Sequence, residues 1–268
     1  MEFLIAIDME GIHGVVGEPY KGLLRELDDY KRAVEGGEKE VNAAAAALFD
    51  AGADKVAVWD NHAGGGNLNF DNIDKRVLKI ECKGDPRRFD FVKEHKFDGI
   101  VYLGYHAREG TLNAVLAHTY SSVSIQYVKI NGSAVGELEI DTYICAEHGI
   151  APIFAASDDI CISQFKALAP KAETVITKYA RGRNAAEFID EDKVLDSIYN
   201  GVLSAAKKEM PTVPYSLPAI VEIRYTRMEM AAVMLERAKE MGISADYGED
   251  AHIIVFTLHK MNDLPKLL

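Results

Sequence analysis

Short apolar runs, separated by longer segments with helical patterning, constrain the fold of this 268-residue chain most strongly. The runs predict buried strands at Phe3–Ile7, Lys55–Trp59, Gly99–Leu103, Ala151–Ala155, Thr174–Thr177, Ala219–Arg224 and His252–Phe256. Helices are expected at Glu38–Asp50, Pro86–His95, Leu138–His148, Asp158–Leu168, Ala185–Lys208 and Met228–Met241. Strands that alternate with helices are typical of βαβ units. We therefore predict an α/β fold with a largely parallel central sheet flanked by helices.

One segment departs from this alternation. Residues 121–130 and 133–136 flank Asn131-Gly132, a dipeptide that favours a two-residue hairpin turn because both of its positions tolerate positive φ. The sequence thus predicts a β-hairpin inserted ahead of Glu137. Farther along, Pro211, Pro214 and Pro218 cluster between a predicted helix and a predicted strand, as a linker would. We expect a large α/β domain at residues 1–210 and a smaller C-terminal α/β lobe at residues 211–268.

Composition excludes several classes of protein. Hydrophobic residues make up 48% of the chain, so disorder is not expected, and no apolar run approaches the ~20 residues that span a bilayer. The net charge of -12 argues against a nucleic-acid partner, which would require a basic face. The apolar start of the chain is too short for a signal peptide, and we predict a cytoplasmic protein with no membrane partner.

Acids and histidines follow the predicted strands where those strands end. Asp8 and Glu10 come after the first strand, His62 after the second and His106 after the third, while Glu137 begins a predicted helix. Each has an ordinary alternative when taken alone: solvated acids, loop histidines, or an acid that favours a helix N-terminus. Carboxyl ends of parallel strands meet at one edge of a sheet, however, and ligands bind there in open α/β folds.

Taken together, these five side chains predict a metal site. Cys82, Cys145 and Cys161 lack the spacing of a thiolate site, so a metal would rely on carboxylates and imidazoles. That mixture suits zinc, with manganese or cobalt as alternatives. Five ligands are too many for one catalytic zinc with an open position, and they suit two metals ~3.5–4 Å apart. The larger domain would then be the metal-binding, catalytic one.

At this point the chain resembles a known family. The motifs are Asp8-Met9-Glu10-Gly11, Asp60-Asn61-His62, Leu103-Gly104-Tyr105-His106-Ala107, Ala117-His118 and Val135-Gly136-Glu137-Leu138. In order and spacing they are similar to those of the M55 family of D-aminopeptidases. The resemblance extends from the first strand to about Arg183 and is weaker in the C-terminal lobe.

The resemblance implies a function and a set of roles. Asp8, Glu10, His62, His106 and Glu137 would bind two zinc ions per subunit, with Asp8 bridging, and His118 would be a catalytic histidine. A water activated by two metals would hydrolyse short peptides and release their N-terminal amino acids, which are expected to be D-amino acids. The resemblance also implies a homo-oligomer, in the form of a decameric ring. Lys178 and Arg183 match basic residues of the family and receive no assigned role.

Some residues near the predicted site depart from the family pattern. They are His13, Asn61 and the run Gly64–Gly66. His13 could contact substrate or point away, and the choice between D- and L-substrates stays open. Two alternatives remain: a dinuclear metal hydrolase of another amide or of a phosphate ester, and a non-catalytic, metal-containing binding protein.

Overall fold

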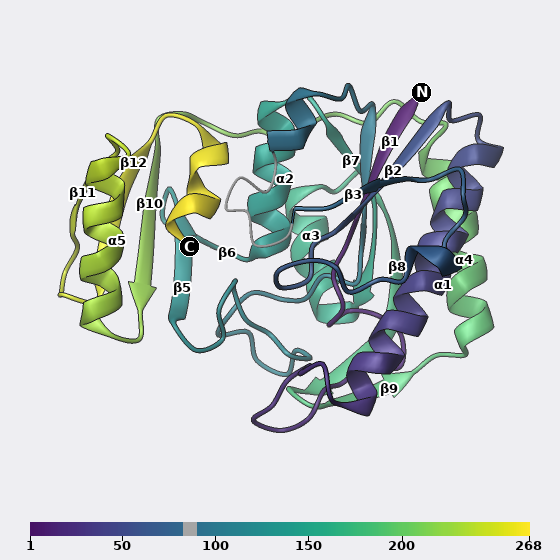
Figure 1. Cartoon of the computed structure of the whole chain (residues 1–268), viewed down its shortest axis with the longest axis horizontal. Helices are drawn as coiled ribbons and strands as arrows, with labels where there is room; N and C mark the ends of the chain where they lie inside the picture. The colour runs from purple at the N-terminus through teal and green to yellow at the C-terminus, as the bar shows by residue number, and fades with distance from the viewer. Residues whose placement is uncertain (83–89) are drawn as a thin grey trace.

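The computed structural model describes residues 1–82 and 90–268, which form two β-sheets with flanking helices (Figure 1). The larger sheet has seven strands in the order β3-β2-β1-β4-β7-β8-β9. Its strands are β1 (Glu2–Ile7), β2 (Lys55–Asp60), β3 (Leu78–Ile80), β4 (Gly99–Leu103), β7 (Ala151–Asp158), β8 (Glu173–Gly182) and β9 (Ala185–Phe188). All neighbours pair in parallel except β9, which returns antiparallel to β8. The predicted α/β class is therefore confirmed.

Helices cover both faces of this sheet because its strands are apolar on both sides. Successive side chains of a strand point to opposite faces. Phe3, Ile5 and Ile7 of β1 accordingly share a core with α1 (Asp28–Asp50) and α4 (Glu191–Ala205), and the intervening Leu4 and Ala6 share another core with α2 (Glu137–Glu147) and α3 (Asp159–Leu168). Figure 1 shows the two helix pairs on opposite sides of the strands. This sandwich fixes the strand ends from which the site is built.

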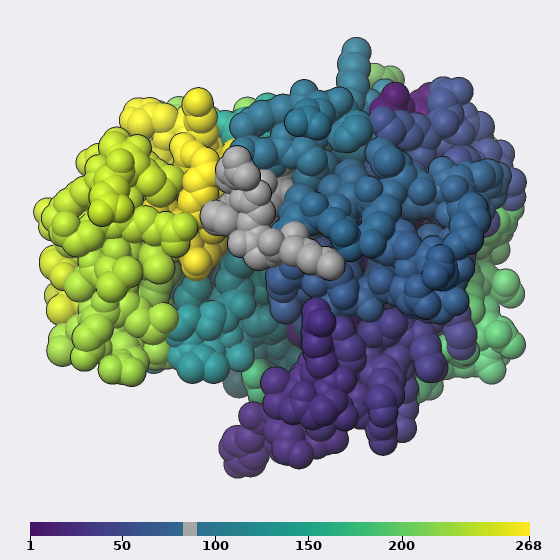
Figure 2. Space-filling model, in the orientation of Figure 1, coloured from purple at the N-terminus to yellow at the C-terminus, as the bar shows by residue number. Residues whose placement is uncertain are grey.

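The second sheet is antiparallel and combines two distant stretches of the chain. Its order is β11-β12-β10-β5-β6. The strands are β5 (Ile125–Ile130), β6 (Ser133–Val135), β10 (Ala219–Tyr225), β11 (Ser244–Tyr247) and β12 (Ile253–Leu258), and α5 (Met228–Glu240) packs on the sheet. The predicted hairpin is confirmed, with φ of 50° at Asn131 and 83° at Gly132. Because β5 pairs with β10, the teal hairpin lies against the yellow-green C-terminal residues (Figure 2). The boundary between residues 210 and 211 stays a prediction.

Several predicted element bounds were wrong. Helix α1 begins at Asp28 and not at Glu38, so Gly36-Gly37 lies inside the helix. The predicted helix Ala185–Lys208 divides into β9 and α4, and the Asp190 side chain caps α4 by accepting a hydrogen bond from the Lys193 N–H. Strands β3 and β11 were not predicted.

Short 3-10 helices complete the described elements: η1 (Phe70–Asn72), η2 (Asp90–Lys93) and η3 (Met261–Leu267). The predicted helix Pro86–His95 lies partly outside the described residues, since residues 83–89 are not among them, and η2 occupies part of the remainder. Within residues 1–82 and 90–268, no helix is both long and apolar enough to cross a membrane.

Candidate metal centre

The site forms where three adjacent parallel strands end. Strand β1 lies between β2 and β4, so the residues that follow these strands meet at one edge of the sheet. Backbone hydrogen bonds continue past the strand ends, from Asp8 N to Leu103 O (2.9 Å) and from Gly11 N to Gly104 O (2.7 Å). The segments that carry Asp8 and His106 are therefore held together by their main chains.

Two glycines permit this close approach. Gly104 has φ of +68°, and a Cβ there would lie 2.0 Å from the carbonyl oxygen of Asp8. At Gly11, a Cβ would lie 2.1 Å from the carbonyl oxygen of Tyr105. Any side chain at these positions would separate the ends of β1 and β4.

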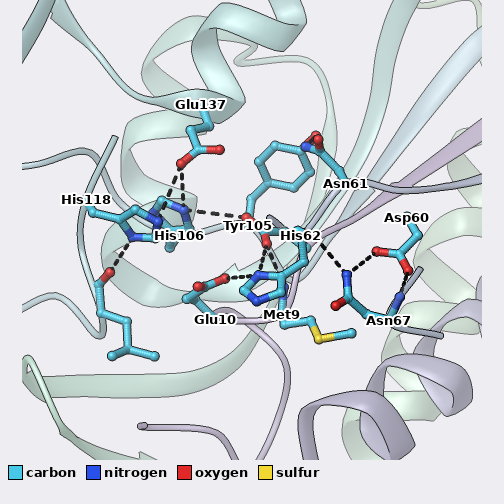
Figure 3. Close-up of polar contacts among 12 residues, drawn as sticks. Met9, Glu10, Asp60, Asn61, His62, Asn67, Tyr105, His106, His118 and Glu137 are labelled. Atoms are coloured by element: carbon cyan, nitrogen blue, oxygen red, sulfur yellow. Dashed lines mark hydrogen bonds and ion pairs between the residues drawn. The ribbon is translucent and has the colours of Figure 1, made fainter. Parts of the chain in front are cut away.

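Two of the predicted carboxylate ligands converge on His62. His62 Nδ1 lies 2.9 Å from Asp8 Oδ1 and 3.1 Å from Glu10 Oε2. Asp8 and Glu10 are almost completely buried, whereas the His62 side chain retains 12% of its exposure. Figure 3 shows the imidazole directed at the Glu10 carboxylate.

The other predicted residues gather around Glu137 at the first turn of α2. Glu137 Oε1 lies 3.2 Å from His106 Nε2 and 3.6 Å from His118 Nε2. The two imidazoles stack, with centroids 3.9 Å apart and planes 10° apart (Figure 3). His106 Nε2 is also 3.5 Å from Asp8 Oδ2, so the two oxygens of Asp8 face different imidazoles.

Backbone carbonyls fix the orientation of both stacked rings. His106 Nδ1 lies 3.0 Å from Ala107 O, and His118 Nδ1 lies 2.8 Å from Leu116 O. Since a carbonyl oxygen only accepts, each Nδ1 carries the proton of that hydrogen bond. Each Nε2 is thereby directed into the cluster, which is the usual arrangement of a metal-binding histidine.

The electrostatics of the cluster favour a cation. Burial, reinforced by the charge of Glu10, raises the pKa of Asp8 to about 7. Burial alone would lower the pKa of His106, but the Glu137 carboxylate close to its Nε2 outweighs burial and raises that pKa to about 10. For His62 the negative charge of Glu10 likewise overcomes burial and raises the pKa well above its usual value. Protons thus balance the buried carboxylates, and a divalent cation would displace them.

The donor atoms also fit a metal geometrically. Two sets of three side chains place ligand atoms within 4.8 Å of one another: Asp8, Glu10 and His106, and His106, His118 and Glu137. Among the described residues, the buried His106 Nε2 finds no partner with hydrogen-bond geometry, although two carboxylates flank it. A metal ion would satisfy that nitrogen. His118, predicted only as a catalytic residue, belongs to the second of these sets.

Lys178 and Arg183 hold the loops that carry two of the predicted residues. The fully buried Lys178 donates from Nζ to the carbonyl oxygens of Glu10, Ile12 and Val15 at 2.5, 2.8 and 2.7 Å. Burial lowers its pKa to about 8. Arg183 Nη1 donates to Ala117 O at 2.7 Å, next to His118. Both side chains thus support the site through the main chain.

The departures from the family pattern also find structural explanations. His13 points toward β9, with Nε2 2.6 Å from Ile189 O, so its imidazole is directed away from the cluster. Asn61 is buried and donates to the Tyr105 hydroxyl at 2.7 Å. The Gly64–Gly66 run belongs to a turn that Asn67 supports, since its Nδ2 donates to His62 O at 2.8 Å.

Sequence reasoning missed the polar residues that support the predicted ligands. Asp60 accepts a hydrogen bond from the Asn67 N–H (Figure 3). It accepts another from the Leu68 N–H and so shapes the loop after β2. Asp141 on α2 accepts hydrogen bonds from Asn61 and Tyr105. The available signal was sequence position: Asp60, Asn61 and Tyr105 lie within two residues of a predicted ligand, and Asp141 lies four residues beyond Glu137.

Comparison with known proteins identifies the class of this chain. A model of the M55 peptidase family, described as D-aminopeptidase, matches residues 1–245. The chain therefore belongs to the M55 family of D-aminopeptidases.

Two relatives illustrate the similarity. A D-aminopeptidase of Bacillus subtilis (strain 168) is 28% identical over 199 residues, which are 72% of this chain and 69% of that protein. The solved structure of the Zn-dependent D-aminopeptidase DppA from Bacillus subtilis, described as a self-compartmentalizing protease, matches with a TM-score of 0.87 and 22% identity. The match covers 100% of this chain and 95% of that one, and it shows that the two share a fold.

Proposed function

We propose that this chain is a zinc-dependent aminopeptidase that removes N-terminal D-amino acids from short peptides. Membership of the M55 family and the Zn-dependent D-aminopeptidase among its structural neighbours support the proposal. The observation that carries it is the position of Asp8, whose Oδ1 faces His62 and whose Oδ2 faces His106. A carboxylate placed in this way suits a bridge between two metals.

The proposed ligand sets follow from these contacts. Asp8, Glu10 and His62 would hold one zinc ion, and Asp8, His106 and Glu137 would hold the other. When bound, two zinc ions would polarise the scissile carbonyl and lower the pKa of a water molecule to about 7. The buried acids and stacked imidazoles keep the ligand atoms in place before substrate arrives.

His118 would move a proton during the reaction. Its Nδ1 is committed to Leu116 O, so Nε2 is the atom available for proton exchange. Burial lowers the pKa of His118 below its usual value, which favours the neutral form that accepts a proton near neutral pH. The same imidazole, once protonated, would deliver the proton to the departing amine.

The proposal extends to the assembly. The structural neighbour is described as self-compartmentalizing. We infer that this chain also forms a closed homo-oligomer, a decameric ring, that admits short peptides. A negatively charged chain, at -12, suits substrates with a free amine.

Paired p-nitroanilides of D-alanine and L-alanine test the activity, with and without EDTA. Selective release from the D-substrate that EDTA abolishes is the expected result. Asp8→Ala should lose bound zinc and at least about 100-fold in kcat/KM, because one change removes a ligand from both metals. Asp71→Ala, at a side chain that is 92% exposed, is the matched control and should keep both. Hydrolysis of p-nitrophenyl phosphate without peptide cleavage, or zinc and turnover retained by Asp8→Ala, would contradict the proposal.

A further inference from the structure

A buried carboxylate on α2 connects the separate segments of the site. Asp141 lies four residues after Glu137, so the two side chains share one face of the helix. Its side chain is completely buried. An aspartate in such a place is costly unless its oxygens accept hydrogen bonds, and it therefore has a structural or positioning role.

The hydrogen bonds of Asp141 come from three different loops. Oδ2 accepts from the Tyr105 hydroxyl at 2.7 Å and from Asn61 Nδ2 at 3.1 Å. Asn61 Nδ2 is also 2.7 Å from the Tyr105 hydroxyl, so these three groups form a closed triangle. Oδ1 lies 3.5 Å from the Tyr120 hydroxyl, a longer contact on its other side.

Each of the three donors lies within two residues of a proposed metal-site residue in the sequence. Asn61 precedes His62, and Tyr105 precedes His106 (Figure 3). Tyr120 follows His118 by two residues. One carboxylate thus reaches the loop after β2, the loop after β4 and the loop that carries His118.

Tyr120 also links Asp141 to Glu137. The Tyr120 N–H donates to Glu137 Oε1 at 2.7 Å, the same oxygen that faces His106 and His118. Tyr120 has φ of 58°, a conformation that is costly outside glycine and persists only where neighbouring contacts hold it. Its backbone N–H contacts Glu137 and its hydroxyl contacts Asp141, both on one face of α2. These two contacts account for that conformation.

We propose that Asp141 is a positioning residue that sets the separation of His62, His106 and Glu137 and thereby the affinity of the site for zinc. The inference rests on the proposed function only for the identity of the metal. Asp141 contacts the neighbours of the ligands, so its loss would not remove a donor atom. It would remove the side-chain contacts that link the three loops, and residues that orient metal ligands typically contribute 10–100-fold to metal affinity.

Asp141→Asn tests the proposal because it keeps the size of the side chain and removes its charge. Zinc affinity is measured on metal-free protein by competition with a chromogenic chelator, together with the absorption spectrum of the cobalt(II)-loaded protein, which reports ligand geometry. We expect zinc to bind 10–100-fold more weakly and the cobalt spectrum to change, while circular dichroism shows a folded protein. Wild-type affinity with an unchanged cobalt spectrum in folded Asp141→Asn would overturn the proposal.

Glu40→Gln provides the matched control. Glu40 is also a buried carboxylate, 1% exposed, but its Oε1 accepts from the backbone N–H of His13 outside this network. The same chemical change there should leave zinc affinity and the cobalt spectrum as in the wild type. An equal loss of zinc affinity in Glu40→Gln would show a general effect of removing buried charge and would overturn the positioning role.

Tyr105→Phe decides the matter if Asp141→Asn does not fold. It removes the 2.7 Å hydrogen bond to Asp141 and leaves an aromatic ring of nearly the same shape. Weaker zinc binding in Tyr105→Phe supports the proposal, and unchanged binding contradicts it.

The proposed function can fail separately from this inference. Wild-type protein that binds zinc but cleaves no peptide would refute the activity and leave the role of Asp141 testable by the same titration.

Discussion

At Glu40, the burial of one carboxyl group connects the stability of the fold to pH. The residue lies on α1, and Oε1 accepts a hydrogen bond of 3.0 Å from His13 N. In the described part of the chain, Oε2 is buried without a hydrogen-bond partner. Burial raises the pKa of Glu40 from its ordinary 4.5 to about 7. The folded protein therefore retains a proton that the unfolded chain releases.

The sign of the resulting prediction follows from that difference. Stability due to the protonated Glu40 is complete below pH 4.5 and is lost as pH rises through about 7. Glu40→Gln cannot ionise. Relative to wild type, it should gain on the order of 3 kcal/mol in free energy of unfolding between pH 4.5 and pH 8. Urea unfolding of both proteins across this range measures the difference, and parallel stability curves would refute the raised pKa.

The sequence predicted which residues gather at the site, but it did not predict the contacts that each of them makes. Asp8, His62 and His106 are polar residues that follow predicted strands, and the sheet order brings those positions together. Their roles as ligands stay predictions. The position of His118 beside Glu137, and the network around Asp141, depend on contacts between loops far apart in the chain, which no local pattern encodes.

Among the elements, β1 and β4 meet at a junction where Gly104 allows the main chains to approach closely. Gly104 combines φ of +68° with a position where a Cβ would lie 2.0 Å from Asp8 O. Gly149, just after α2, has φ of +76° with nothing within 4 Å of such a Cβ. The two glycines thus share a backbone conformation and differ in the space around them.

Alanine at these two positions separates conformational strain from steric overlap. Gly149→Ala should cost about 1 kcal/mol, since only the left-handed conformation is disfavoured. Gly104→Ala should cost at least about 3 kcal/mol, because the main chains of β1 and β4 must also move apart. Chemical denaturation of both variants measures the difference. Equal losses would mean that the junction adapts without strain.

The element predictions succeeded where the pattern was local and failed where packing decided. Strand β4 and the Asn131-Gly132 turn follow directly from an apolar run and from turn chemistry. Helix α1 extends ahead of the predicted start at Glu38 and includes Gly36-Gly37, where a Cβ at Gly36 would lie 2.8 Å from Ile12 Cγ2. Strand β9 escaped prediction since its pairing with β8, and not its composition, makes it a strand.

For the molecule as a whole, exposed apolar side chains mark a surface where copies would meet in the proposed assembly. Tyr20, Leu24 and Val123 line one hollow of about 680 Å³ on the loops beside Leu116, and their exposed fractions are 109%, 48% and 80%. Burying a large apolar side chain contributes about 1.5–3 kcal/mol, so repeated contacts of this kind would stabilise a closed ring. Leu116, which also lines this hollow, lies two residues before His118.

Sedimentation velocity tests the proposed assembly. Ten copies of the 29.5 kDa chain should sediment as one species of about 295 kDa. Val123→Asp should shift the protein to smaller species, since it places a charge in the proposed contact. Val233→Asp on α5, at a valine that is 61% exposed, makes the same change elsewhere and should leave the large species intact. A wild-type monomer at micromolar concentration would exclude self-compartmentalisation. Loss of the large species in Val233→Asp alone would place the contact on the second sheet instead.

Because a ring limits entry by size, the disassembled Val123→Asp protein should also cleave longer peptides better, relative to dipeptides, than the wild type does.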